Sequence, residues 1–150
     1  MEIIQESIFP ERHLEYATFG GRFVARVIDG LVMLIPGGII SYMFRTNYPS
    51  LIENIPGLVK ASLASWVVTW LYFAIMESGP NQGTFGKKAI GIKVTTLNGG
   101  QLTFMQASGR YFGKLLSGLI IYIGYFMMLW DDRNQTLHDK MAGAVVVKSY

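Results

Sequence analysis

The chain has 150 residues, of which 51% are hydrophobic and 15% are charged, and its formal net charge is +3. This composition predicts one domain, and it is too apolar for an ordinary soluble domain of this size. The absence of cysteine excludes disulfides and thiolate chemistry, and the two histidines, His13 and His138, argue against a structural zinc site.

The first fifteen residues are acidic, with four glutamates, Glu2, Glu6, Glu11 and Glu15, against one arginine. A secretory signal begins with a basic region, so we expect no cleavable signal peptide and interpret the next apolar segment as a retained signal anchor. The predicted division is an acidic N-terminal segment, 1–15, and a membrane domain, 16–148.

Residues 23–44 form the first predicted transmembrane helix, because the segment is long enough to span a bilayer. We expect Pro36, which precedes Gly37 and Gly38, to kink or break this helix. Asp29 lies inside the segment. A carboxylate there is costly and is seldom kept without a partner or a task.

Arg22, Arg26 and Asp29 share one face of this helix, because their spacing is i, i+4 and i+7. Arg26 and Asp29 are also within ion-pair range. One interpretation is a structural ion pair that orients the helix. The others are a carboxylate that handles an ion or a proton, since ionisable groups in membranes often mark pathways, and a docking surface for a partner.

Residues 58–76 form the second predicted transmembrane helix, with one charge, Lys60, near its end. The link 45–57 is weakly charged, whereas the stretch 77–114 carries five basic residues and one acid. The positive-inside rule therefore predicts that the N-terminus and 77–114 are cytoplasmic and that 45–57 is external. Because topology explains the basic residues, we expect no nucleic-acid partner.

The stretch 83–104 changes to a period of two, and β-branched residues surround an Asn98-Gly99 turn. This pattern predicts a β-hairpin whose returning strand is 101–104. An isolated hairpin is marginal, and the run 144–148 is a third candidate strand. We predict a small cytoplasmic three-stranded sheet in which 144–148 pairs with 90–96.

Residues 115–130 are a third hydrophobic segment, which is uncharged and short for a span. If it crosses the membrane, the C-terminus lies outside and cannot reach the sheet. If it enters and returns, with bends at Gly118 and Gly124, the C-terminus stays inside. The short length favours the second form, and both alternatives stay open.

Asp139 and His138 form a second polar cluster near the C-terminus. A histidine can titrate near neutral pH, although one beside an aspartate is more often an ordinary hydrogen-bonded group. If segment 115–130 returns, Asp139 can reach Arg22 or Arg26. The result is a buried Arg–Asp network, which is costly to break.

Small residues recur at every fourth position in two segments, which allows helices to approach closely in lipid. The two sets are Gly109, Gly113 and Ser117, and Ala61, Ser65 and Thr69. Either they pack within this chain or they mediate oligomerisation.

Several longer motifs follow one another along residues 16–148. They are Gly21-Arg22-Phe-Val-Ala25-Arg26-Val-Ile28-Asp29, Gly83-Thr-Phe-Gly86-Lys87, Gly91-Ile-Lys-Val94, Gly99-Gly100-Gln-Leu-Thr-Phe-Met-Gln-Ala107 with Arg110, and Gln135-Thr-Leu-His138-Asp139-Lys-Met-Ala142-Gly143 with Val145-Val-Val147. In these residues and in their order the sequence resembles the RDD family of small bacterial membrane proteins.

The resemblance implies that the family's two aspartates map to Asp29 and Asp139 and that its arginine maps to Arg22 or Arg26. It also implies a small helical bundle with a cytoplasmic hairpin. The activity of the family is largely undefined. Transport, including cation–proton exchange, is suggested for some members, and others act as partners or regulators of membrane proteins.

We therefore predict an all-α membrane protein with two full transmembrane helices, a third short or re-entrant hydrophobic helix, and a small cytoplasmic β-hairpin or three-stranded sheet. The predicted location is the bacterial inner membrane, with several crossings and a cytoplasmic N-terminus. The candidate cluster comprises Arg22, Arg26, Asp29, His138 and Asp139.

The first predicted function is transport-related: the cluster exchanges a cation, a proton or a small ligand, and the chain forms an oligomer because so few helices cannot enclose a pathway. The alternative is a non-catalytic adaptor or regulator of a partner membrane protein. No nucleophile–base pair indicates an enzyme, and we expect no cofactor and no metal.

Overall fold

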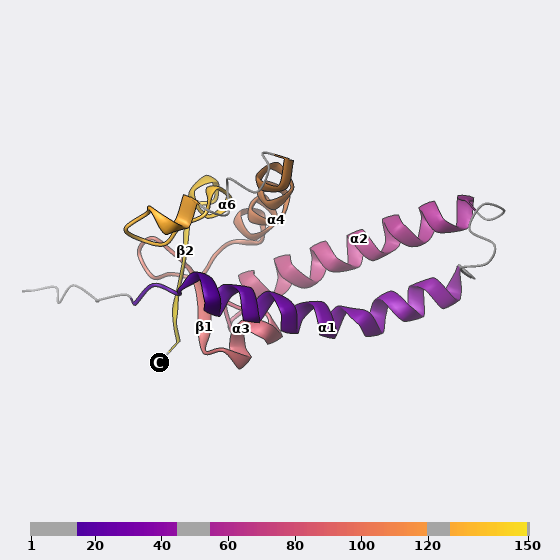
Figure 1. Cartoon of the computed structure of the whole chain (residues 1–150), viewed down its shortest axis with the longest axis horizontal. Helices are drawn as coiled ribbons and strands as arrows, with labels where there is room; N and C mark the ends of the chain where they lie inside the picture. The colour runs from indigo at the N-terminus through magenta and orange to yellow at the C-terminus, as the bar shows by residue number, and fades with distance from the viewer. Residues whose placement is uncertain (1–14, 45–54, 120–126, 150) are drawn as a thin grey trace, which may run out of the picture.

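A computed structural model describes residues 15–44, 55–119 and 127–149 of the chain, and it is mostly helical. Two long helices, α1 (Phe19–Met43) and α2 (Ile55–Ser78), lie side by side and extend from a group of shorter elements, which we call the head (Figure 1). The head contains α3 (Phe85–Ala89), β1 (Ile92–Thr96), α4 (Phe104–Leu119), η2 (Met127–Leu129), α6 (Leu137–Met141) and β2 (Ala144–Lys148).

The two long helices expose much of their apolar surface. α1 has 25 residues and α2 has 24, so each is about 36 Å long, which exceeds the hydrocarbon core of about 30 Å. Large side chains such as Leu31, Leu34 and Ile35 are exposed along α1. By length and composition both helices can cross a membrane, which confirms the prediction of two long apolar helices.

α1 continues without interruption through Pro36, so the predicted break in this helix is wrong. Proline removes one backbone donor from the helix. The remaining hydrogen bonds persist, because exposed backbone groups find no substitute partners in apolar surroundings.

The sheet has two antiparallel strands, and their pairing confirms the predicted contact between 144–148 and 90–96. The predicted third strand at 101–104 is wrong: Gly99 (φ 78°) makes the expected turn, but no strand follows it. Thr103 and Gln106 form a reciprocal pair of side-chain to backbone hydrogen bonds at the start of α4. This capping box ends the extended backbone and begins a helix.

A different segment lies along the outer edge of β2. Tyr16 bridges Val147, and the Ala17 amide donates to the Val146 carbonyl at 2.9 Å. The residues immediately before α1 therefore complete the edge that the predicted hairpin strand would have covered. Ala17 and Val146 also belong to the main apolar core, which joins the sheet to the first turns of α1.

The head contains an internal repeat. In each copy a threonine stands at the N-cap of a five-residue helix, a glycine with positive φ follows the helix, and a five-residue strand comes next. The corresponding residues are Thr84 and Thr136, Gly91 and Gly143, and Val94 and Val146. Val94 and Val146 pair with each other at the centre of the sheet. The strands β1 and β2 are thus related by a local two-fold axis through that pair.

The predicted third hydrophobic segment, 115–130, is only partly described. Its beginning is the end of α4, and Met127–Leu129 form the short 3₁₀ turn η2. α4 continues through Gly118, the first of the two predicted bends. The second, Gly124, lies outside the described residues, so the re-entrant form stays a prediction. α4 begins well before this segment and packs on α2 through aromatic contacts, including Trp66 with Phe112 at 5.6 Å between ring centroids.

Candidate functional site

The predicted site residues fall into two separate groups. One group surrounds Asp29 on α1, and we call it the Asp29 cluster: Asp29, Tyr72, Thr84 and Gly86. The other surrounds Arg110 on α4, and we call it the Arg110 network: Arg22, Glu77, Lys87, Arg110 and Asp139. The expected single cluster of Arg22, Arg26, Asp29, His138 and Asp139 is therefore divided.

Asp29 is buried and accepts hydrogen bonds from three neutral donors. Its Oδ1 accepts from the Tyr72 hydroxyl at 2.8 Å and from the Gly86 amide at 2.8 Å. Its Oδ2 accepts from the Thr84 hydroxyl at 2.6 Å. Tyr72 lies on α2, and Thr84 and Gly86 begin α3, so one carboxylate joins three helices.

The glycine at position 86 brings α3 directly onto α1. A Cβ atom at Gly86 would lie 2.0 Å from the Ala25 carbonyl oxygen and 2.9 Å from Asp29 Cγ. Any larger residue would therefore displace α3 and remove its amide and hydroxyl donors from Asp29.

The predicted ion pair between Arg26 and Asp29 is wrong. Among residues 15–44, 55–119 and 127–149, no basic side chain pairs with Asp29. Arg26 is exposed as a residue, and its guanidinium lies 4.7 Å from the centroid of the Phe73 ring. Neutral donors from α2 and α3 satisfy Asp29, so the charge of Arg26 stays partly in solvent.

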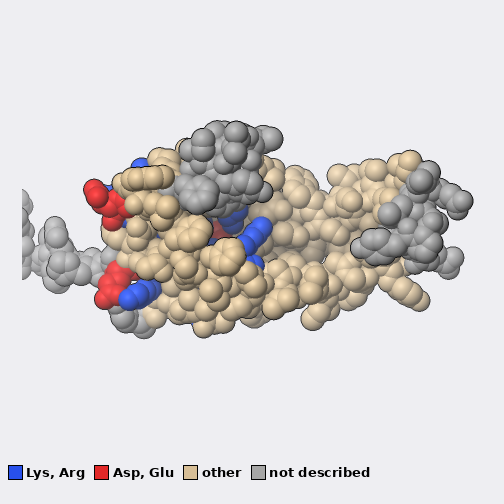
Figure 2. Space-filling model, in the orientation of Figure 1, with Lys and Arg blue, Asp and Glu red and all other residues tan. Residues whose placement is uncertain are grey.

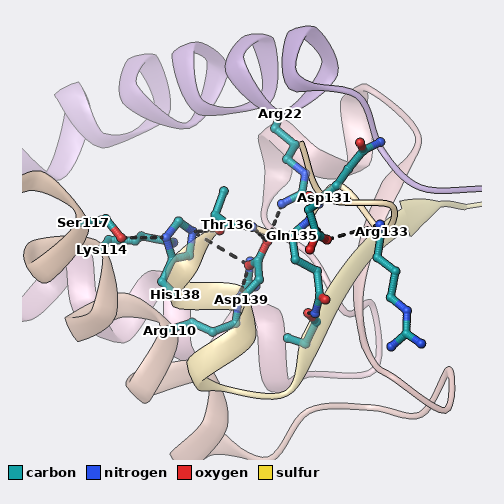
Figure 3. A network of polar contacts seen from close by, with 12 residues as sticks. Arg22, Arg110, Lys114, Ser117, Asp131, Arg133, Gln135, Thr136, His138 and Asp139 are labelled. Atoms are coloured by element: carbon teal, nitrogen blue, oxygen red, sulfur yellow. Dashed lines mark hydrogen bonds and ion pairs between the residues drawn. The ribbon is translucent and has the colours of Figure 1, made fainter. Parts of the chain in front are cut away.

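Arg110 is the centre of the second group and is itself 2% exposed. Its Nη1 donates to Glu77 Oε2 at 2.6 Å, and its Nη2 and Nε donate to Asp139 Oδ1 at 2.6 and 3.0 Å. Lys87 pairs with the other oxygen of Glu77, and Arg22 donates to Asp139 Oδ2 at 2.5 Å. The result is a buried row of alternating charges, part of which Figure 3 shows around Asp139.

The contact of Asp139 with Arg22 selects one of the two arginines that the sequence left open. Arg22 also donates to the Asn134 carbonyl at 2.7 Å, so it fixes the loop before α6. Burial favours the neutral form of Asp139, but Arg110 and Arg22 outweigh it and hold the pKa of this carboxyl well below its usual range.

His138 is an ordinary hydrogen-bonded histidine in this structure. Its Nε2 lies 2.9 Å from the Thr136 hydroxyl and its Nδ1 lies 3.4 Å from the Ser117 hydroxyl (Figure 3). Burial lowers the pKa of His138 to about 3, and the nearby Arg110 and Lys114 act in the same direction, against Asp139. The ring is therefore neutral at physiological pH.

Several residues of these groups were absent from the predicted cluster, and each left a signal in the sequence. Glu77 is the lone acid of the basic stretch 77–114, at the end of an apolar segment. Thr84 and Gly86 have the N-cap and small-residue character of a close helix contact. In the described part of the chain, no group of histidine and carboxylate side chains could hold a metal ion.

The fold is that of a membrane-associated helical protein. It has two long apolar helices and a head in which buried arginine and carboxylate side chains form ion pairs. The RDD family model matches residues 16–143, and the chain belongs to this family.

A protein of Bacillus subtilis (strain 168), "Uncharacterized protein YxaI", is 33% identical over an alignment of 147 residues that covers 87% of this chain and 96% of that protein. A "Proline-rich antigen homolog" of Mycobacterium tuberculosis (strain CDC 1551 / Oshkosh) is 28% identical over 111 residues, which cover 69% of this chain and 43% of that protein. No solved structure matches the chain.

Proposed function

We propose that the protein is a transport-related component of the bacterial inner membrane in which Asp29 binds a proton or a cation. The observation that carries this proposal is the environment of Asp29. It is a buried carboxylate on an apolar helix, and its partners in the described residues are all neutral. An ionisable group in a membrane segment is a functional candidate by default.

The Arg110 network has a different role in this proposal. Asp139 has two guanidinium partners, and Glu77 has Lys87 and Arg110. These carboxylates remain ionised and hold the head together. Among the described residues Asp29 has no such counter-charge, so it is the group that can exchange a proton for a cation without breaking an ion pair.

The proposed topology is a helical hairpin with its head on the cytoplasmic side. β2 pairs with β1, and the residues before α1 contact β2, so both described ends of the chain meet the segment that follows α2. The basic residues of the head agree with the positive-inside rule. Two crossing helices cannot enclose a pathway, so the proposal includes an oligomer or a membrane-protein partner.

The topology can be tested by labelling of Ser149→Cys, because the chain has no native cysteine. Ser149 lies at the exposed end of β2, where its amide donates to the Gly91 carbonyl at 2.8 Å. We expect a membrane-impermeant maleimide to label it only after the cells are opened. Labelling in intact cells would contradict a cytoplasmic head.

The exchange function can be tested with Asp29→Asn in vesicles that contain a pH-sensitive dye. We expect cation-driven proton movement in the wild type upon addition of Na⁺, K⁺ or Li⁺, and its loss in Asp29→Asn at unchanged protein level. Asp132→Asn, at an exposed position of the head, is the matched control and should behave as the wild type. Equal flux in Asp29→Asn would remove Asp29 from the mechanism.

The second candidate is a non-catalytic adaptor, and one observation favours it. Both oxygens of Asp29, Glu77 and Asp139 have partners, so each carboxylate can be purely structural. In this case Asp29→Asn lowers the folded yield, and no cation moves protons in the wild type. Copurification from native membranes would then identify a partner, and the absence of any partner above background would count against the adaptor.

A further inference from the structure

Basic side chains outnumber carboxylates where α1, α2 and α4 meet the head. The basic side chains are those of Arg22, Arg26, Lys87, Arg110 and Lys114. The carboxylates are Glu77 and Asp139, and including the separately bonded Asp29 still leaves an excess of positive charge. Uncompensated positive charge near a low-dielectric surface attracts anions strongly.

Two of these cations have no hydrogen bond among the described residues. Lys114 Nζ lies 3.8 Å from Glu77 Oε1, which is beyond hydrogen-bond distance, and 4.6 Å from the Phe73 ring centroid. Arg26 lies 4.7 Å from the same centroid and has no ion pair within 15–44, 55–119 and 127–149. Phe73 is 3% exposed, so cations from α1 and α4 cover one ring. We call Arg26, Phe73 and Lys114 the basic recess.

The charge on Lys114 is poorly compensated. Burial lowers the pKa of Lys114 to about 7. Glu77 opposes this shift, whereas Lys87, Arg110 and Arg26 add to it. An anion in the basic recess would supply the missing counter-charge and the missing hydrogen-bond acceptors.

The basic recess lies at the head end of the two long helices. Arg26 is about 10 Å along α1 from its first residue, at a rise of 1.5 Å per residue. α4 exposes apolar side chains, including Met105 and Leu115, beside the apolar surface of α2. Figure 2 shows Lys and Arg side chains in a hollow in the middle of one face, next to the uncharged surface of the long helices.

We propose that the basic recess binds the phosphate of an anionic lipid headgroup through Arg26 and Lys114. The planar guanidinium of Arg26 suits two phosphate oxygens, and the Lys114 ammonium contributes a point charge. Basic pockets between helices on the cytoplasmic side commonly bind such headgroups. This site is independent of exchange at Asp29, and its test leaves Asp29 unchanged.

The test uses the full chain in neutral detergent, with soluble short-chain phosphatidylglycerol as the probe. We expect the double variant Arg26→Gln/Lys114→Gln to raise the dissociation constant at least tenfold. The matched control is Lys93→Gln/Arg133→Gln, which removes the same charge from elsewhere in the head and should change the constant less than twofold. Arg26→Lys/Lys114→Arg, which keeps both charges, should stay within about threefold of the wild type.

The same set of variants defines the results that would overturn the proposal. Equal binding by wild type and Arg26→Gln/Lys114→Gln, or an equal loss in the Lys93→Gln/Arg133→Gln control, would overturn it. If the double variant fails to fold, Arg26→Gln alone replaces it, because Arg26 is exposed, and an unchanged constant would overturn the proposal as well.

Inorganic phosphate is the probe for the alternative source of the anion. We expect millimolar phosphate to leave bound phosphatidylglycerol in place, because the lipid adds apolar contacts with α2 and α4. Displacement of the lipid by phosphate would overturn the lipid assignment and identify a site for the free anion.

Discussion

The two copies of the internal repeat share the order of N-cap threonine, five-residue helix, glycine and strand, but they carry opposite charges at one equivalent position. In α3–β1, the helix supplies neutral donors to Asp29, and Lys87 extends to Glu77. In α6–β2, the residue that corresponds to Lys87 is Asp139, which accepts from Arg110 and Arg22. Lys87 of the first copy and Asp139 of the second are thus connected through the ion pair between Glu77 and Arg110. Attraction between opposite charges therefore holds the two copies together.

Each copy packs closely against a longer helix through one glycine, but this glycine lies in the repeat in the first copy and in the longer helix in the second. In the first copy it belongs to the repeat, where Gly86 lies against the backbone of α1. In the second copy the equivalent residue is His138, and the glycine belongs to the neighbouring helix as Gly113. In the first copy the small residue is on the short helix, and in the second copy it is on the long helix. Packing within this chain, rather than oligomerisation, explains Gly113.

The largest effect is expected from removing the link between the copies. Arg110→Ala leaves Glu77 and Asp139 without their shared partner in a buried site. Breaking a buried ion pair costs about 3–5 kcal/mol, and two are lost here, so we expect the free energy of unfolding to fall by at least about 4 kcal/mol. Unfolding in mixed micelles measures this loss.

Arg133→Ala is the control for Arg110→Ala, because Arg133 is an exposed arginine of the same head. It should change the free energy of unfolding by less than about 0.5 kcal/mol. If Arg110→Ala is equally mild, the network does not hold the two copies together.

The next largest effect is expected from replacing the two glycines at these close contacts, Gly86 and Gly113. In Gly86→Ala the new methyl group meets the Ala25 carbonyl oxygen at 2.0 Å, so we expect a loss of about 3 kcal/mol, at the upper end for overpacking. Gly113→Ala meets His138 Cβ at 3.0 Å and Cα at 3.3 Å and should cost about 1 kcal/mol, because this overlap is smaller than the one at 2.0 Å.

Gly30→Ala is the matched control, because a Cβ atom there has nothing within 4 Å. Alanine favours a helix interior by about 1 kcal/mol over glycine, so this variant should be neutral or more stable. A loss in Gly30→Ala as large as that in Gly86→Ala would mean that glycine, and not the close approach, matters.

The parts of this fold that the sequence predicted are those that depend on pattern along the chain. Apolar length predicted the two long helices, and alternation predicted that 144–148 pairs with 90–96. For Asp139 the sequence offered Arg22 or Arg26 as partners, on the condition that segment 115–130 returns, and the structure shows the contact with Arg22. Each of these inferences uses one segment or one complementary pair.

The Asp29 cluster could not be predicted in this way, because its donors come from two other helices. Helical spacing places Arg26 within reach of Asp29, but it does not say what lies opposite that face. Tyr72, Thr84 and the Gly86 amide occupy the carboxylate first. The prediction of a third strand at 101–104 was wrong for a related reason, because the capping box of Thr103 and Gln106 starts a helix where the hairpin pattern predicted a strand.

A pH effect of intermediate size should separate the two copies, because only the second contains a histidine. The pKa of His138 is about 3 in the fold, against about 6.5 when unfolded, so the unfolded chain binds more protons between these values. The contribution of neutral, buried His138 to the free energy of unfolding is therefore fully present above pH 6.5 and decreases as the pH falls below this value. From pH 7 to pH 5 we expect a loss of about 2 kcal/mol.

His138 dominates the window above pH 5, because the depressed pKa of Asp139 acts mainly below it, and Lys114, whose pKa of about 7 lies in the window, adds a loss of less than about 1 kcal/mol. His138→Gln keeps a polar group near the Thr136 hydroxyl but cannot become charged. Its free energy of unfolding should fall by less than about 1 kcal/mol from pH 7 to pH 5, which is the part that Lys114 contributes. An unchanged slope in this variant would assign the pH effect to another group.

The smallest effect should come from one neutral donor of the Asp29 cluster. Tyr72→Phe removes the hydroxyl that donates to Asp29 Oδ1 at 2.8 Å and keeps the ring. A hydrogen bond contributes about 1 kcal/mol, and the Gly86 amide still donates to the same oxygen, so we expect a loss of about 1 kcal/mol. Tyr42→Phe, at an exposed tyrosine of α1, is the control and should cost nothing measurable. A loss as large as that of Arg110→Ala would mean that Asp29 depends on its tyrosine as strongly as Asp139 depends on its arginines, and the contrast between the neutral and the charged copy would disappear.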